Sequence, residues 1–177
     1  MGPRVTGAQE NSPAKGRGSA SLGVSHNGGG RAVAPAAGPA FRLQGWESRL
    51  AAIVEAARST PYKLGEHDCF RFACAAVEAL TGADIWTTWA GRYRTRREAL
   101  RRIHEFGGGG FTEAATRLFG GPLVHPGLAR RGDVLEYEDA AREQHLGVCV
   151  GAHVAVLKDS GLAFVPLHEC RHGWRVG

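Results

Sequence analysis

The sequence lacks the long apolar segments that mark membrane proteins and exported proteins. No apolar run in its 177 residues approaches the roughly 18 residues that cross a bilayer. The N-terminus likewise lacks the apolar core of a signal peptide. These two absences predict a protein that has no membrane span and is made in the cytoplasm without a signal peptide.

Cysteine is scarce, and its spacing argues against two common uses of the residue. The four cysteines are Cys69, Cys74, Cys149 and Cys170, and no two of them form a CxxC pair. A chain of this length builds a core without disulfides, so we expect reduced thiols, one of them reactive. His168-x-Cys170-x-His172 is a compact set of metal ligands, but its spacing fits none of the standard zinc sites. We therefore predict no metal and no other cofactor.

Excess positive charge is nearly absent from the main body of the chain. The formal net charge is +5, but residues 1–45 hold five basic groups against one acidic group. The remaining 132 residues carry 17 basic and 16 acidic groups. A nucleic-acid-binding domain usually carries its basic surface on the folded part, so nucleic acid is not an expected partner. We interpret the arginine-rich stretch 92–102 as a solvated helix face, with contact to an anionic polymer as its alternative role.

Composition divides the chain into two parts at residue 45. Gly, Ala, Pro and Ser fill 26 of the first 45 positions, which predicts a disordered tail. From Trp46, helical periodicity predicts helices near 46–57, 70–81, 96–105 and 112–119, with Leu100 and Ile103 facing inward. Alternation then predicts strands over 133–137, 144–150, 153–157 and 162–165. This order indicates one α+β domain over 46–177, with N-terminal helices packed on a small antiparallel β-sheet.

Cys69 and His145 form a candidate catalytic pair. Cys69 lies at the predicted start of the second helix, with Asp68 as its N-cap, where unpaired N–H groups and the helix dipole favour a thiolate. His145 shares one face of its predicted strand with Gly147 and Cys149. The small Gly147 leaves room on that face for the start of the Cys69 helix. The pattern therefore predicts Cys69 as a nucleophile and His145 as its base.

Three blocks of the sequence resemble the NlpC-type branch of papain-like cysteine peptidases and occur in that family's order. They are Pro61-Tyr62-x-x-Gly65-x-x-Asp68-Cys69, Arg131-Gly132-Asp133-Val134-Leu135 and His145-Leu146-Gly147-Val148-Cys149-x-Gly151. Further motifs are similar to those of a branch found among bacteriophage tail and gene-transfer-agent proteins. These are His67-Asp68-Cys69-Phe70, Leu80-Thr81-Gly82-Ala83-Asp84, Gly91-Arg92-Tyr93, the Gly107–Gly110 run and Trp174-Arg175-Val176.

The resemblance implies a papain-like NlpC-type fold and a cysteine peptidase or amidase that acts on bacterial cell-wall peptides. Cys69 and His145 would be catalytic, and Asp68, Tyr62 and Gly65 would support them. The expected partners are a cell-wall peptide substrate and other phage tail proteins. We expect the protein to be made in the bacterial cytoplasm and delivered in a phage particle or tail.

Two departures from the family pattern leave a second interpretation open. Phe70-Arg71 follow the cysteine where the family usually has Ser-Gly, and no third catalytic residue is evident on the strand after His145. The candidates for the third position are His153 and His168. The alternative function is a catalytically degraded NlpC-like protein with a structural or assembly role in a phage tail or gene transfer agent.

Overall fold

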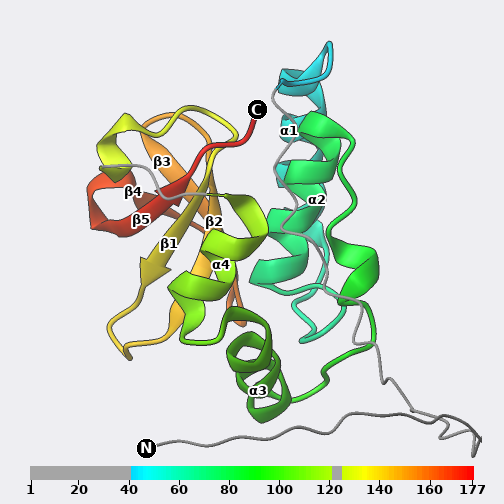
Figure 1. Cartoon of the computed structure of the whole chain (residues 1–177). Coiled ribbons are helices and arrows are strands. Elements are labelled where there is room, and N and C mark those ends of the chain that lie inside the picture. Colours follow the sequence, from blue (N-terminus) through cyan, green and yellow to red (C-terminus); the bar gives the residue numbers. More distant parts are fainter. Residues whose placement is uncertain (1–40, 121–124) are drawn as a thin grey trace, which may run out of the picture. The chain divides into compact units, whose positions relative to one another are not determined.

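Four α-helices precede five β-strands in the part of the chain that the structure, a computed structural model, describes: residues 41–120 and 125–177 (Figure 1). The helices are α1 (Trp46–Ser59), α2 (Cys69–Thr81), α3 (Arg96–Gly107) and α4 (Phe111–Phe119). The strands are β1 (Val134–Glu138), β2 (Gln144–Cys149), β3 (His153–Lys158), β4 (Gly161–Pro166) and β5 (Cys170–Trp174). This arrangement confirms the predicted α+β class.

Local signals in the sequence fix the ends of the helices. Asp68 is the N-cap of α2, and its Oδ1 accepts a hydrogen bond from the Arg71 amide at 2.9 Å. Gly82 ends the same helix in the left-handed conformation, with a φ of 78°. Thr95 begins α3 through a capping box with Glu98. Among the described helices, none has the length and apolar character needed to span a bilayer.

The five strands form one antiparallel sheet in the order β4-β3-β2-β1-β5. The first four strands lie within one residue of the predicted ends. β5 is not predicted, because Arg171 and His172 interrupt its apolar alternation. Arg171 instead pairs with Glu138 at 2.9 Å, and Nδ1 of His172 lies 3.0 Å from a carboxylate oxygen of Glu136. Polar pairing with β1 therefore takes the place of the apolar pattern.

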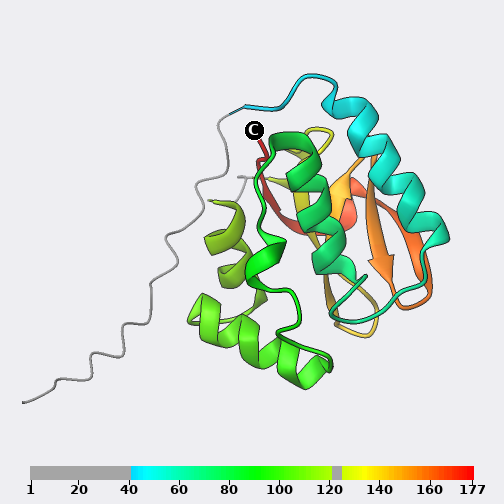
Figure 2. The same ribbon diagram turned by 90° about the vertical axis from the view of Figure 1, so that its right-hand side faces the viewer.

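The helices cover one face of the sheet, as the two views in Figures 1 and 2 show. That face contributes Leu146, Val148 and Trp174 to a core shared with α1, α2 and α4. The opposite face carries a smaller core that includes Leu135 and Cys149. α2 packs directly on β2, so the first residues of the helix lie beside the sheet.

α3 differs from the other helices because none of its residues is fully buried. Ile103 is partly buried, but Leu100, which is predicted to face inward, is 63% exposed. The prediction for Leu100 is therefore wrong. The physical reason is that α3 packs mainly on α4, and one side of it borders a cavity instead of the core.

Residues 41–45, which composition assigns to the disordered tail, contact the folded body. The Leu43 amide donates a hydrogen bond of 2.7 Å to the last turns of α2. Arg42 pairs with the buried Asp133 at 3.0 Å. The tail prediction fails for these residues because composition does not register a side chain whose partner lies 91 residues later. Residues 1–40 of the predicted tail lie outside the described residues.

Candidate active site

The loop 61–68 before α2 is held together by the carboxylate of Asp68. Its Oδ2 accepts hydrogen bonds from the Gly65 amide at 2.8 Å and the Tyr93 hydroxyl at 2.7 Å, while Oδ1 caps α2. Gly65 has a φ of +80°, and a Cβ there would lie 2.2 Å from the carbonyl oxygen of Tyr93. Any larger residue would collide with that backbone. Asp68 and Gly65 therefore fix the backbone from which Cys69 begins the helix.

Cys69 is the first residue of α2 and is half-buried, whereas the other three cysteines are buried. Burial raises the pKa of the Cys69 thiol to about 12, and the neighbouring Asp68 carboxylate adds to the rise. Hydrogen bonds from the backbone amides of Leu146, Phe70 and Cys69 itself lower this pKa by less. The predicted lowering of the pKa is wrong, because burial disfavours the thiolate and the anion that caps the helix also repels it. Cys69 is therefore a neutral thiol near neutral pH, and its use as a nucleophile would require a base.

His145 lies near the start of β2, at the end of the sheet that borders the Cys69 cavity. α2 packs on the face of β2 that carries Leu146, opposite to the face of Gly147. Gly147 leaves no room for a helix, because a Cβ there would lie 2.6 Å from Cγ1 of Val154. The predicted docking face is therefore wrong. His145 reaches the cavity through its position at the strand end and not through a shared face with Gly147.

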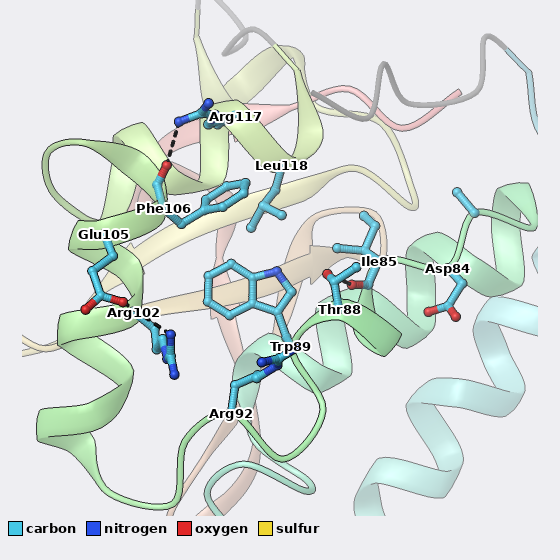
Figure 3. Close-up of a pocket in the computed structure, with 11 residues that line it drawn as sticks. Asp84, Ile85, Thr88, Trp89, Arg92, Arg102, Glu105, Phe106, Arg117 and Leu118 are labelled. Atoms are coloured by element: carbon cyan, nitrogen blue, oxygen red, sulfur yellow. Dashed lines mark hydrogen bonds and ion pairs between the residues drawn. The ribbon is translucent and has the colours of Figure 1, made fainter. Parts of the chain in front are cut away.

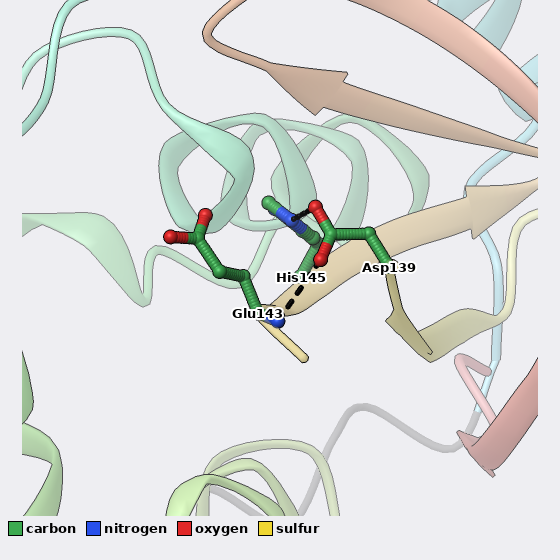
Figure 4. A group of neighbouring side chains, drawn as sticks. All are labelled: Asp139, Glu143 and His145. Carbon is green, nitrogen blue, oxygen red and sulfur yellow. Dashed lines mark hydrogen bonds and ion pairs between the residues drawn. The ribbon is translucent and has the colours of Figure 1, made fainter. Parts of the chain in front are cut away.

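Asp139 is the partner of the His145 ring, with its Oδ2 3.3 Å from Nε2 (Figure 4). The backbone amide of Glu143 donates to Oδ1 of Asp139 at 3.0 Å and is the main reason that the pKa of Asp139 lies below its usual value. The hydrogen bond from the His145 ring lowers the same pKa further. An ionised carboxylate at this place fixes the orientation of the imidazole and keeps a proton on Nε2.

Asp139 escapes prediction from the sequence for a physical reason. It precedes His145 by six residues, in the loop between β1 and β2, whereas the third position is sought after the histidine. An Asp that begins a loop usually accepts hydrogen bonds from local backbone amides, as Asp139 does from Ala141. The informative signal is the hairpin register, which pairs Tyr137 with His145 and places the loop beside the imidazole.

The two histidines proposed for the third position lie elsewhere. His153 begins β3 and His168 lies in a short 3₁₀ turn after β4, and both are exposed and outside the Cys69 cavity. Cys170 is buried in the smaller core, whereas His172 bonds to Glu136, its partner in the β1–β5 register, next to a β-bulge. The described residues therefore do not assemble His168, Cys170 and His172 as metal ligands.

Cys69 and His145 line one cavity of about 300 Å³, together with Tyr62. Burial raises the pKa of Tyr62 to about 12, so its hydroxyl keeps its proton near neutral pH. Within the described ranges, no hydrogen bond joins Sγ of Cys69 to the His145 ring. The expected approach of about 3–4 Å between the two groups stays a prediction.

Asp139, Glu143 and His145 each present one possible metal ligand, and these atoms lie within 4.8 Å of one another (Figure 4). The two carboxylates already have partners within the protein. Asp139 binds the His145 ring, and both carboxylate oxygens of Glu143 face Arg96, one of them at 2.8 Å. Because the guanidinium charge disfavours a cation nearby, we interpret the set as a hydrogen-bonded group and not as a metal centre.

A second cavity of about 350 Å³ borders Trp89, which also lines the Cys69 cavity (Figure 3). Its walls combine the rings of Trp89 and Phe106 with the side chains of Arg102 and Arg117. Arg117 donates to the Phe106 carbonyl at 2.7 Å. None of the predicted site residues lines this second cavity, so the Cys69 cavity is the candidate active site.

The chain belongs to the family described as "Domain of unknown function (DUF6950)", whose model matches residues 41–176. The match begins within the segment 41–45 that contacts the folded body, and it includes the Cys69 cavity and the loop of Asp139. No curated protein matches the sequence. The family description names no activity, so a functional assignment depends on the geometry of the site.

Proposed function

We propose that this member of the family is a cysteine hydrolase. Cys69 is the nucleophile, His145 is the base, and Asp139 is a positioning residue that orients the base. The observation that carries the proposal is the single cavity shared by Cys69 and His145, with Asp139 bonded to Nε2 of the imidazole. A thiol, an imidazole and an ionised carboxylate can serve as the nucleophile, the base and the group that orients the base in acyl transfer.

The reaction begins from the neutral thiol, since the pKa of Cys69 is raised. Because Asp139 engages Nε2, Nδ1 of His145 accepts the thiol proton as Sγ attacks the carbonyl carbon of an amide. Backbone N–H groups at the first turn of α2 stabilise the oxyanion. The imidazolium then protonates the leaving amine, the C–N bond breaks, and a thioester remains on Cys69. His145 next takes a proton from water, whose attack on the thioester releases the acid and restores the thiol.

For the substrate, we extend the proposal to bacterial cell-wall peptides on the basis of the resemblance to NlpC-type peptidases. The same resemblance supports a papain-like fold and a place in a phage or gene-transfer-agent tail, where other tail proteins would be partners. The placement of the three motif blocks is consistent with this: one begins α2, one leads into β1 and one lies on β2.

The alternative of a catalytically degraded tail protein is weakened by two observations. It depended on the lack of a third residue, and Asp139 offers an ionised partner from the other side of the hairpin. It also depended on Phe70 in place of the family's serine. The Phe70 ring packs against Trp89 with centroids 5.0 Å apart, so this substitution builds an aromatic wall of the cavity.

The test is hydrolysis of purified peptidoglycan and of a synthetic cell-wall peptide, measured as the release of new amino groups. Cys69→Ala should abolish the reaction, and His145→Ala should slow it by at least about 100-fold. The double variant should be no slower than Cys69→Ala alone, because the two residues act as a unit. His153→Ala, which changes an exposed histidine, is the matched control. Undiminished activity of the Cys69→Ala variant would contradict the proposal.

Asp139→Asn tests the positioning residue and the metal alternative together. We expect at least about a tenfold loss of kcat, because the amide no longer holds the required tautomer of the imidazole. Asp159→Asn, in the exposed turn after β3, is the control. Activity should survive EDTA; a loss that Zn²⁺ or Mn²⁺ restores would instead identify Asp139, Glu143 and His145 as a metal centre.

A further inference from the structure

One wall of the Cys69 cavity is apolar and comes largely from α3. Ala99, Leu100 and Ile103 line the cavity from this helix, and Leu64 and Phe111 line it from other elements. Leu100 is 63% exposed although it is a large apolar side chain. Part of the exposed surface of Leu100 therefore borders the same cavity as the Cys69 thiol.

The acidic, basic and imidazole side chains that line this cavity already have partners within the protein. They are Asp68, which accepts three hydrogen bonds; His145, held by Asp139; Arg96 and Glu143, which pair with each other; and Arg142, paired with Glu138 at 2.9 Å. Gln144 donates to Glu136 at 2.8 Å. Among the described residues, the cavity wall thus offers apolar surface, while Arg96 and Arg142 lie at its exposed edge in ion pairs with Glu143 and Glu138.

We propose that the cavity selects an uncharged, apolar side chain next to the bond that Cys69 attacks, with Leu100 as a specificity-determining residue. The proposal rests on the proposed function, because it takes Cys69 as the nucleophile. An apolar group that covers Leu100 and Ile103 removes their surfaces from water, which is favourable. A charged group placed against Leu100 and Ile103 would lose hydration that these apolar side chains do not replace. The volume of about 300 Å³ admits a side chain of several carbons together with the scissile bond.

The experiment compares the rates at which three alkylating probes modify Cys69 in the full-length protein. The probes are iodoacetamide, N-hexyl iodoacetamide and iodoacetate, and each rate is divided by the rate of the same probe with glutathione. We expect the normalised rate to be about tenfold higher for the hexyl probe than for iodoacetamide, the lower range of discrimination by an apolar pocket. Iodoacetate should be the slowest of the three.

Variants of Leu100 test whether this residue causes the preference for the hexyl probe. Leu100→Gln should bring the normalised ratio of hexyl probe to iodoacetamide close to one, whereas Leu100→Met should retain most of it. Leu128→Gln is the matched control, because Leu128 is 61% exposed and lies outside this cavity. A ratio that is unchanged in Leu100→Gln would overturn the role of Leu100.

The outcomes separate this inference from the proposed function. Equal normalised rates for the hexyl probe and iodoacetamide would overturn apolar selection, while efficient labelling of Cys69 by both would leave the hydrolase proposal standing. Labelling of Cys74, Cys149 or Cys170 ahead of Cys69 by iodoacetamide would overturn both proposals.

Discussion

Asp68 has two opposing effects on Cys69. Its carboxylate caps α2 and binds Gly65 and Tyr93, so it fixes the position of the thiol. Its negative charge also raises the thiol pKa, and burial raises it more. An argument from the helix dipole alone misses this, because the dipole is screened locally by the anion that begins the helix. On the proposed function, the site therefore depends on His145 to generate the nucleophile during the reaction.

We expect the alkylation of Cys69 to depend steeply on pH. Because the thiol pKa is raised, the thiolate is a minor species near neutrality, and the rate with iodoacetamide should rise about tenfold per unit between about pH 7 and pH 10. Mass spectrometry of timed samples measures this rate. Asp68→Asn removes a negative charge, so it should lower the pKa and shift the curve to lower pH. A rate that stays constant between pH 6 and pH 8 would instead indicate a preformed thiolate–imidazolium pair.

At the scale of elements, the loop before α2 should be sensitive to a single methyl group. Gly65→Ala should destabilise the protein by roughly 2–4 kcal/mol, because the new Cβ meets the Tyr93 carbonyl and the φ of +80° is unfavourable for alanine. Gly91→Ala is the matched control: its φ is +69° but nothing lies within 4 Å of the added Cβ. That variant should lose only about 1–2 kcal/mol. Urea unfolding of both variants measures the difference, and equal losses would contradict the steric argument.

Helix ends and most strands are predictable from the sequence because the forces that set them are local. Asp68 and Gly82 bound α2 through hydrogen bonds and φ values that neighbouring residues determine. β5 and the exposure of Leu100 are not predictable in this way. They depend on β1, which offers acidic partners, and on the packing of α3 against α4, and both are contacts between distant segments.

The features of the candidate site are likewise predictable where they depend on local sequence and not where they depend on contacts between distant segments. Cys69 at a helix start and His145 on a strand follow from motifs and periodicity. The side of β2 that faces α2 cannot be predicted in this way, because alternation defines two faces of a strand without indicating which one a helix covers. The raised pKa of Cys69 and the contact of Asp139 with His145 also require the three-dimensional arrangement, since both arise from groups brought together by folding.

For the whole molecule, Arg42 joins the start of the described chain to its end. It pairs with Asp133, which is fully buried, and donates to the Val176 carbonyl at 2.7 Å. Arg42→Ala should lower the free energy of unfolding by about 1–3 kcal/mol, because it leaves the Asp133 carboxylate with less compensation. Arg49→Ala, an exposed arginine of α1, should change it by less than about 0.5 kcal/mol. Equal stability of the two variants by urea unfolding would show that Arg42 does not stabilise the fold.

The hairpin that carries Asp139 and His145 has a consequence for the order in which the protein matures. These two residues are six positions apart, and a hairpin closes in roughly 1–10 μs. Cys69 lies far earlier in the chain and joins them only when α2 docks on β2, a contact of high sequence separation that forms more slowly. A partly folded chain therefore holds the Asp139–His145 pair before Cys69 reaches it. On the proposed function, hydrolytic competence arises only with the completed tertiary structure and not with the local hairpin.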